Sequence, residues 1–141
     1  MKITQEADYA VRIAYCLAKN GKTDAKSISE EAVIPARFTL KILRKMMEGG
    51  IVESIMGAGG GYRLSREPDS INLRRVIEII DGPITFNRCI GDEYECSRVN
   101  CKKSCPFHLI FTLVNEAITE RLDKITLASV LECGCRVTEI L

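Results

Sequence analysis

The stretch of residues 27–65 constrains the fold most, because it predicts three elements in close succession. Ser27, followed three positions later by Glu30, has the pattern of a capping box that begins a short helix. Pro35 suits the first turn of a second helix, and a pair of glycines ends that helix. Residues 51–65 alternate apolar and polar side chains on both sides of a glycine-rich turn, which is typical of a β-hairpin. Two short helices followed directly by a hairpin predict a winged helix-turn-helix.

Two further helices complete the prediction of a mostly α fold with one small β-hairpin wing. The first runs from Thr4 to about Lys19, where Asn20-Gly21 is typical of a helix C-cap. The second is a long amphipathic helix near the C-terminus. Its apolar stripe comprises Phe107, Ile110, Phe111, Val114, Ala117, Ile118, Leu122 and Ile125.

The second helix of the helix-turn-helix carries cations on one face and has no acidic residue between Pro35 and Met47. A charged stripe alone is often just a solvated face, but the hairpin that follows favours a helix that enters a DNA groove. Residues 1–66 contain 11 basic and 7 acidic residues, a balance of +4, whereas residues 67–141 have a balance of −3. The cations are Arg37, Lys41, Arg44 and Lys45, and the side chains expected to be buried are Phe38, Leu40, Ile42, Leu43, Met46 and Met47.

The cysteine content points to metal or redox chemistry. The chain has no apolar run long enough to span a membrane and no apolar stretch typical of a secretion signal near its start. We therefore expect a cytoplasmic protein with no membrane partner, in a compartment where lasting disulfides are rare. Seven cysteines in such a chain favour metal binding or thiol chemistry over a disulfide scaffold.

Four cysteines and the only histidine lie within 20 positions. Their spacing is Cys89-x6-Cys96-x4-Cys101-x3-Cys105-x2-His108. Thiolates bind both zinc and iron–sulfur clusters, and imidazole binds either. Structural zinc sites usually place cysteines in C-x2–4-C pairs. Only Cys96/Cys101 and Cys101/Cys105 come near that spacing, without the tight turn of C-x2-C. An open loop of more widely spaced cysteines favours a cluster, with zinc as the alternative.

Three motifs resemble the winged-helix transcription regulators typified by IscR, NsrR and CymR. They are M-K-I-T-Q-E-A-D-Y-A-V-R at the start, G-A-G-G-G-Y-R-L-S-R-E-P-D-S-I at the wing and I-E-I-I-D-G-P-I after it. The resemblance covers residues 1–131 and implies a homodimer on near-palindromic promoter DNA, with the long helix as the dimerisation helix. It does not imply a cofactor, because some members bind an iron–sulfur cluster and others lack the cysteines for one. The expected parts are a DNA-binding domain in 1–82, a cluster-binding loop in 83–105, and the dimerisation helix and tail in 106–141.

The resemblance also implies roles for individual residues. Cys89, Cys96 and Cys105 match the three cluster ligands of the family, for a 2Fe-2S or 4Fe-4S cluster. The fourth ligand stays open between Cys101, which is an additional thiol, His108, and Asp8, which matches an aspartate that NsrR-like members supply across the dimer. The residues expected at DNA are Ser27, Arg37, Phe38 (mostly packing), Thr39, Lys41 and Arg44, with Gly60, Tyr62 and Arg63 of the wing.

Cysteines outside the loop carry weaker signals. Cys16 lies among apolar residues of the first helix, so we expect a core position. Cys133 and Cys135 have no assigned role. The resulting hypothesis is a dimeric regulator whose promoter binding responds to a cluster, and thereby to iron, redox state or nitric oxide. Its alternatives are a zinc-binding or thiol-based regulator of the same fold and, more distantly, a cysteine-dependent enzyme, since one histidine offers little for acid–base catalysis.

Overall fold

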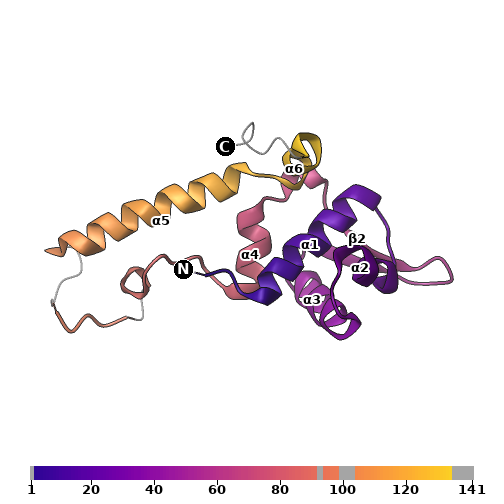
Figure 1. The fold of residues 1–141 in the computed structure, drawn as a ribbon, viewed down its shortest axis with the longest axis horizontal. Coiled ribbons are helices and arrows are strands. Elements are labelled where there is room, and N and C mark those ends of the chain that lie inside the picture. Colours follow the sequence, from indigo (N-terminus) through magenta and orange to yellow (C-terminus); the bar gives the residue numbers. More distant parts are fainter. Residues whose placement is uncertain (1, 92–93, 99–103, 135–141) are drawn as a thin grey trace.

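The computed structural model describes residues 2–91, 94–98 and 104–134, which form a mostly helical fold with one antiparallel hairpin (Figure 1). This confirms the predicted fold class. The elements in chain order are α1 (Gln5–Asn20), α2 (Ala25–Ala32), α3 (Ala36–Glu48), β1 (Val52–Ile55), β2 (Gly61–Leu64), η1 (Pro68–Ser70), α4 (Leu73–Asp81), η2 (Arg88–Ile90), α5 (Pro106–Lys124) and α6 (Leu127–Cys133). None of the helices in these described ranges is both long and apolar enough to cross a membrane.

The first helix of the helix-turn-helix begins earlier than predicted. Asp24, rather than Ser27, is the N-cap of α2, and its carboxylate accepts hydrogen bonds from the backbone N–H groups of Lys26 and Ser27. The Ser27 hydroxyl donates to the same carboxylate at 2.6 Å. An aspartate at this position satisfies two helix N–H donors at once, so the capping box predicted at Ser27 was wrong.

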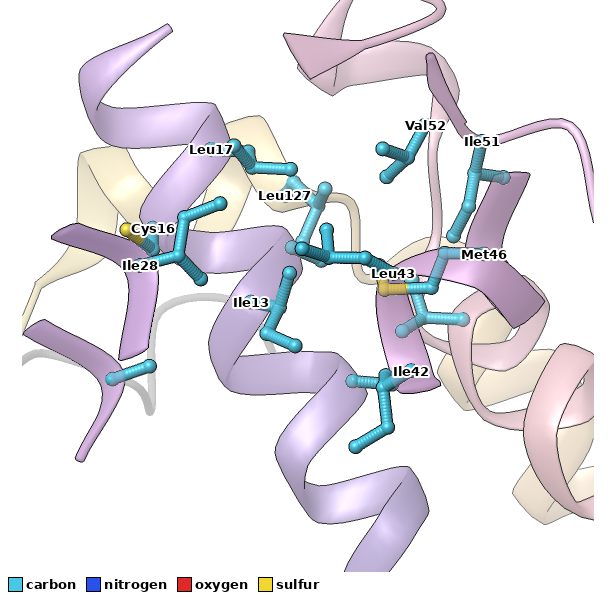
Figure 2. Packing of buried hydrophobic residues seen from close by; sticks show 14 of the residues in the cluster. Ile13, Cys16, Leu17, Ile28, Ile42, Leu43, Met46, Ile51, Val52 and Leu127 are labelled. Carbon is cyan, nitrogen blue, oxygen red and sulfur yellow. The ribbon is translucent and has the colours of Figure 1, made fainter. Parts of the chain in front are cut away.

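The core lies where α1, α2 and α3 meet (Figure 2). Ile13 of α1, Ile28 of α2 and Leu43 of α3 are fully buried, and Leu127 of α6 packs into the same cluster. Cys16 is also buried, in agreement with its predicted core position. Because three helices and the returning α6 share this cluster, the rotation of α3 about its axis is fixed by packing.

One residue of α3 faces the opposite way from the prediction. Leu40 was expected in the core but is 53% exposed. The side chains that are buried recur at i, i+3, i+4 and i+7, which is the true apolar face of the helix. Leu40 falls one position outside this face, so its residue type misled the prediction. The four buried residues are Thr39, Ile42, Leu43 and Met46.

The wing hairpin is tied to the helical core. Val52 pairs with Leu64 and Ile55 with Gly61, so the strands match the predicted hairpin. Thr23, just before α2, exchanges two backbone hydrogen bonds with Tyr62 at 2.9 and 2.8 Å. This bridge sets the wing directly beside the helix-turn-helix.

The C-terminal helices leave the core and return to it. Figure 1 shows α5 extending away from the other helices, with its N-terminal end farthest out. Backbone hydrogen bonds from Leu73 to Ile125 and from Leu127 to Ile71, both 2.9 Å, then join the end of α5 and the start of α6 to the segment before α4. The predicted division at residues 82 and 105 stays a prediction.

Candidate nucleic-acid interface and cysteine loop

The outer face of α3 is exposed and predominantly cationic. Arg37, Lys41 and Arg44 all lie on this face together with Leu40. Arg44 forms an ion pair of 3.1 Å with Glu48 one turn later, at a largely exposed position. Three of the four predicted cationic residues of the helix are therefore exposed at the surface, and Lys45 is half-buried.

Two of the lysines share one carboxylate of α1. Lys45 donates to Glu6 at 2.7 Å, and Lys41 donates to the other oxygen of the same side chain. The side-chain hydrogen bonds from Lys41 and Lys45 lower the pKa of Glu6 from 4.5 to about 2. No local sequence pattern predicted this contact, since Glu6 lies more than 30 positions before its partners.

Thr39 does not reach the outer face. It is 0% exposed, and its hydroxyl donates to the carbonyl of Pro35 at 3.4 Å. Thr39 was expected to contact DNA, but the structure places it in the core instead, because the residue belongs to the i, i+3, i+4 buried face of the helix. Phe38 is half-buried, its ring 6.1 Å from that of Tyr9, and the Arg37 guanidinium stacks 4.9 Å above its centroid.

The wing residues have structural roles of their own. Tyr62 holds the bridge to Thr23, and Arg63 forms a cross-strand ion pair with Glu53. The N–H of Gly60 donates to the carbonyl of Gly57 at 2.9 Å, so it closes the turn and is not available for a phosphate. Beside this turn the structure adds an apolar side chain that the sequence analysis missed, Met56, which is 89% exposed.

The cysteine loop precedes and contacts α5. Cys89 lies in η2, which packs against α5, and Cys105 is the buried N-cap residue of α5. Cys96 is half-buried, whereas Cys101 lies outside the described residues. Within residues 2–91, 94–98 and 104–134, no three histidine, cysteine, aspartate or glutamate side chains are grouped closely enough to hold a metal ion.

His108 follows Cys105 by one turn of α5. In the described part of the chain its Nδ1 atom is buried and has no hydrogen-bond partner. A buried ring nitrogen of this kind costs free energy unless it gains a partner, and imidazole nitrogen is a common metal ligand. Asp8, by contrast, is exposed and forms an ordinary i, i+4 pair of 2.7 Å with Arg12.

Aromatic contacts anchor the loop to α5. The rings of Phe86 and Phe111 lie 5.7 Å apart, and the backbone N–H of Phe86 donates to Asn115 at 2.7 Å. The Arg98 guanidinium lies 5.1 Å from the ring centroid of Phe107 at the start of the helix. The loop is thus held to α5 at both ends of its described part.

Residues 3–133 match the model of one family, Rrf2, described as an iron-dependent transcriptional regulator. The chain belongs to the Rrf2 family.

Individual Rrf2 proteins cover nearly the whole chain. The HTH-type transcriptional regulator CymR of Bacillus subtilis is 31% identical over 130 residues, which are 90% of this chain and 87% of the relative. The solved structure of CymR, the global cysteine regulator of B. subtilis, has a TM-score of 0.73 at 28% identity and covers 92% of this chain and 95% of its own. The structure of T. potens IscR has a TM-score of 0.74 at 27% identity, with coverages of 94% and 87%.

Membership in Rrf2 confirms the predicted winged-helix regulator and its DNA partner. The alternative of a cysteine-dependent enzyme is set aside, because the relatives and solved structures are transcriptional regulators.

In this Rrf2 chain α5 exposes an apolar surface. Phe111, Ile118 and Leu122 are partly buried against the same chain, but other large apolar residues of the helix face outward. The exposed residues are Phe107, Leu109, Ile110, Leu113 and Val114. Cys133 is buried at the end of α6, and Cys135 lies outside the described residues.

Proposed function

We propose that this Rrf2 regulator is a homodimer whose binding to promoter DNA is controlled by an iron–sulfur cluster on the loop of residues 83–105. Three parts of the molecule support the proposal: the cationic face of α3 with the wing, the exposed apolar surface of α5, and the thiols of the loop. The first part would contact DNA, the second would form the dimer, and the third would hold the cluster.

The DNA contacts are proposed on the outer face of α3. Arg37, Lys41 and Arg44 are long cationic side chains that reach phosphates or base edges when a helix enters the major groove. Ser27 lies exposed at the start of α2, and its hydroxyl can donate to a phosphate if it gives up its hydrogen bond to Asp24. Arg63 is exposed on β2 and extends the contact from the wing.

The dimer contact is proposed on α5. A soluble monomer rarely leaves five large apolar side chains exposed on one helix, since burying each releases ordered water. A second copy of α5 offers a matching apolar surface, as expected for an interface with twofold symmetry. Two α3 helices are then held at a fixed separation, which suits a near-palindromic site.

The buried Nδ1 of His108, one turn after the buried Cys105, is the observation that carries the cluster proposal. Cys89, Cys96 and Cys105 provide the thiolates that iron–sulfur clusters require. His108, Cys101 and Asp8 remain the candidates for a fourth ligand. A bound cluster supplies a group that changes with iron supply, oxidants or nitric oxide.

The contacts of the loop suggest how its state reaches DNA. Phe86 packs on Phe111 and hydrogen-bonds Asn115, so a rearrangement of the loop acts directly on α5. The far end of α5 is joined to the segment before α4 through the hydrogen bond between Leu73 and Ile125. A shift of α5 against its partner therefore changes the separation of the two α3 helices.

Iron and sulfide analysis of protein purified without oxygen tests the cluster. The proposal predicts matched iron and sulfide, a visible absorbance, and loss of both in Cys89→Ala. Cys16→Ala is the matched control, because it also removes one thiol, but from the core, and leaves the loop unchanged. A colourless protein that holds zinc or no metal contradicts the cluster and supports a zinc-binding or thiol-based regulator.

A further inference from the structure

Leu40 is an apolar side chain in the middle of a cationic surface. It is 53% exposed in the second turn of α3, with Arg37 one turn before it and Arg44 one turn after it. Lys41 is its exposed neighbour in sequence. Single exposed leucines are common on proteins, but this one lies between cations on the face proposed to meet DNA.

The core prevents Leu40 from turning inward. The opposite face of α3 is packed into the core, where Thr39, Ile42 and Leu43 are all 0% exposed. This packing fixes the rotation of α3 about its axis. Leu40 therefore faces outward as long as this core stays packed. The side chain cannot make an ion pair or a hydrogen bond, so it can contribute to binding on this face only through an apolar contact.

The major groove of B-DNA presents one apolar group, the C5-methyl of thymine. In a helix-turn-helix the first turns of the second helix are the part that approaches the base edges. Leu40 belongs to this part of α3, whereas the flanking arginines are long enough to reach phosphates on either side. The chemistry of the surface thus matches a methyl group flanked by phosphates.

We propose that Leu40 is a specificity-determining residue that contacts the C5-methyl of a thymine in each half of the operator. The inference rests on the proposed role of α3 at DNA and adds the identity of a base that this chain selects. It also predicts that the preference is for thymine over cytosine and over uracil, since both of these lack the methyl group.

The test compares thymine with uracil, which differ only by the methyl. The full chain first selects a duplex from a randomised DNA pool, and each thymine of that duplex is then replaced singly by deoxyuridine. At one position in each half-site the replacement should weaken binding of the wild-type protein by about fourfold, the value expected for one methyl group removed from an apolar contact. Leu40→Ala should bind the thymine and uracil duplexes equally at that position.

Met56→Ala is the control variant. It also removes an exposed apolar side chain, but from the wing, and should keep the wild-type difference between thymine and uracil. The inference is overturned if no single replacement weakens wild-type binding, or if Leu40→Ala retains the fourfold difference. Selection of no duplex at all overturns the proposed role of α3 as well, so the two failures are distinguishable. An unchanged melting temperature of Leu40→Ala confirms that the comparison is made between folded proteins.

Discussion

Glu6 of α1 accepts a hydrogen bond of 2.7 Å from Lys45 of α3, two helices apart in the helix-turn-helix domain. The same carboxylate also accepts from Lys41, so one acid pairs with two cations beside the proposed DNA surface. Phosphates would compete with Glu6 for these ammonium groups. The contact therefore links the packing of α1 on α3 to the strength of DNA binding.

Replacing Glu6 by glutamine should strengthen DNA binding. The substitution removes a negative charge near the phosphates and releases Lys41 and Lys45 to contact them. We expect affinity to rise about threefold to tenfold at low salt, and the slope of log K against log salt to steepen by about one to two units. Fluorescence anisotropy with a labelled operator over a salt series measures both quantities.

Glu31→Gln provides the comparison for that experiment. Glu31 pairs with Lys19 at 3.0 Å, which is a similar ion pair between α1 and α2 and involves no residue of α3. Its removal should leave affinity and salt slope close to wild type. If both variants behave alike, or if Glu6→Gln weakens binding, then Glu6 does not compete with phosphates.

Glu6 should also contribute to stability in a defined pH window. Its pKa is about 2 in the folded protein against an ordinary 4.5, because Lys41 and Lys45 favour the charged form. A lowered pKa means that the stabilisation is fully present above pH 4.5 and is lost as the pH falls towards 2. Urea unfolding at about pH 6 and pH 2.5 should therefore show a difference between wild type and Glu6→Gln that shrinks on acidification. A difference that stays constant with pH contradicts the role of the carboxylate charge.

Gly60 should tolerate no side chain, whereas the preceding glycine should. A Cβ at Gly60 would lie 2.5 Å from the backbone carbonyl oxygen of Ile55, which is closer than real Cβ contacts. A Cβ at Gly59 would meet only the Lys22 ammonium at 3.5 Å, an ordinary contact. Gly60→Ala should lower the free energy of unfolding by about 1–3 kcal/mol, and Gly59→Ala should change it by less than about 0.5 kcal/mol. Equal effects in urea unfolding would show that the wing turn differs from the one described here.

A charge on the exposed surface of α5 should separate the proposed dimer. Leu113 is 65% exposed near the middle of the helix, where a glutamate would be buried against its partner. Leu113→Glu should sediment as a folded monomer and lose cooperative binding to a palindromic site. Met56→Glu places the same charge on the wing and should remain dimeric. If Leu113→Glu remains dimeric, the dimer interface does not lie on this surface of α5.

Sequence patterns predicted the elements better than the orientation of individual side chains. The hairpin and the first helix follow from alternation and from Gly21, whose N–H caps α1, so local signals were sufficient for them. Leu40 and Thr39 were misassigned because residue type was given more weight than the helical period. Asp24 is a preferred N-cap residue and could have been recognised as the start of α2. The Ser27–Glu30 pattern was chosen instead.

The contacts of Glu6 and the buried nitrogen of His108 depend on packing between distant segments, and no local pattern encodes them. The spacing of the cysteines identified the loop as a candidate ligand set. It could not show how the loop is attached to α5 through Phe86 and Phe111, because that contact requires the fold.

One comparison shows whether a cluster on the loop sets the affinity for DNA. Operator affinity is measured without oxygen for the iron- and sulfide-containing protein and for the same preparation after chelation of its iron. The two dissociation constants should differ by about fivefold or more, the usual range of coupling between two sites, and the Cys89→Ala protein should match the chelated form. Equal affinities of the two forms, in protein shown to contain iron and sulfide, would contradict control of DNA binding by the cluster.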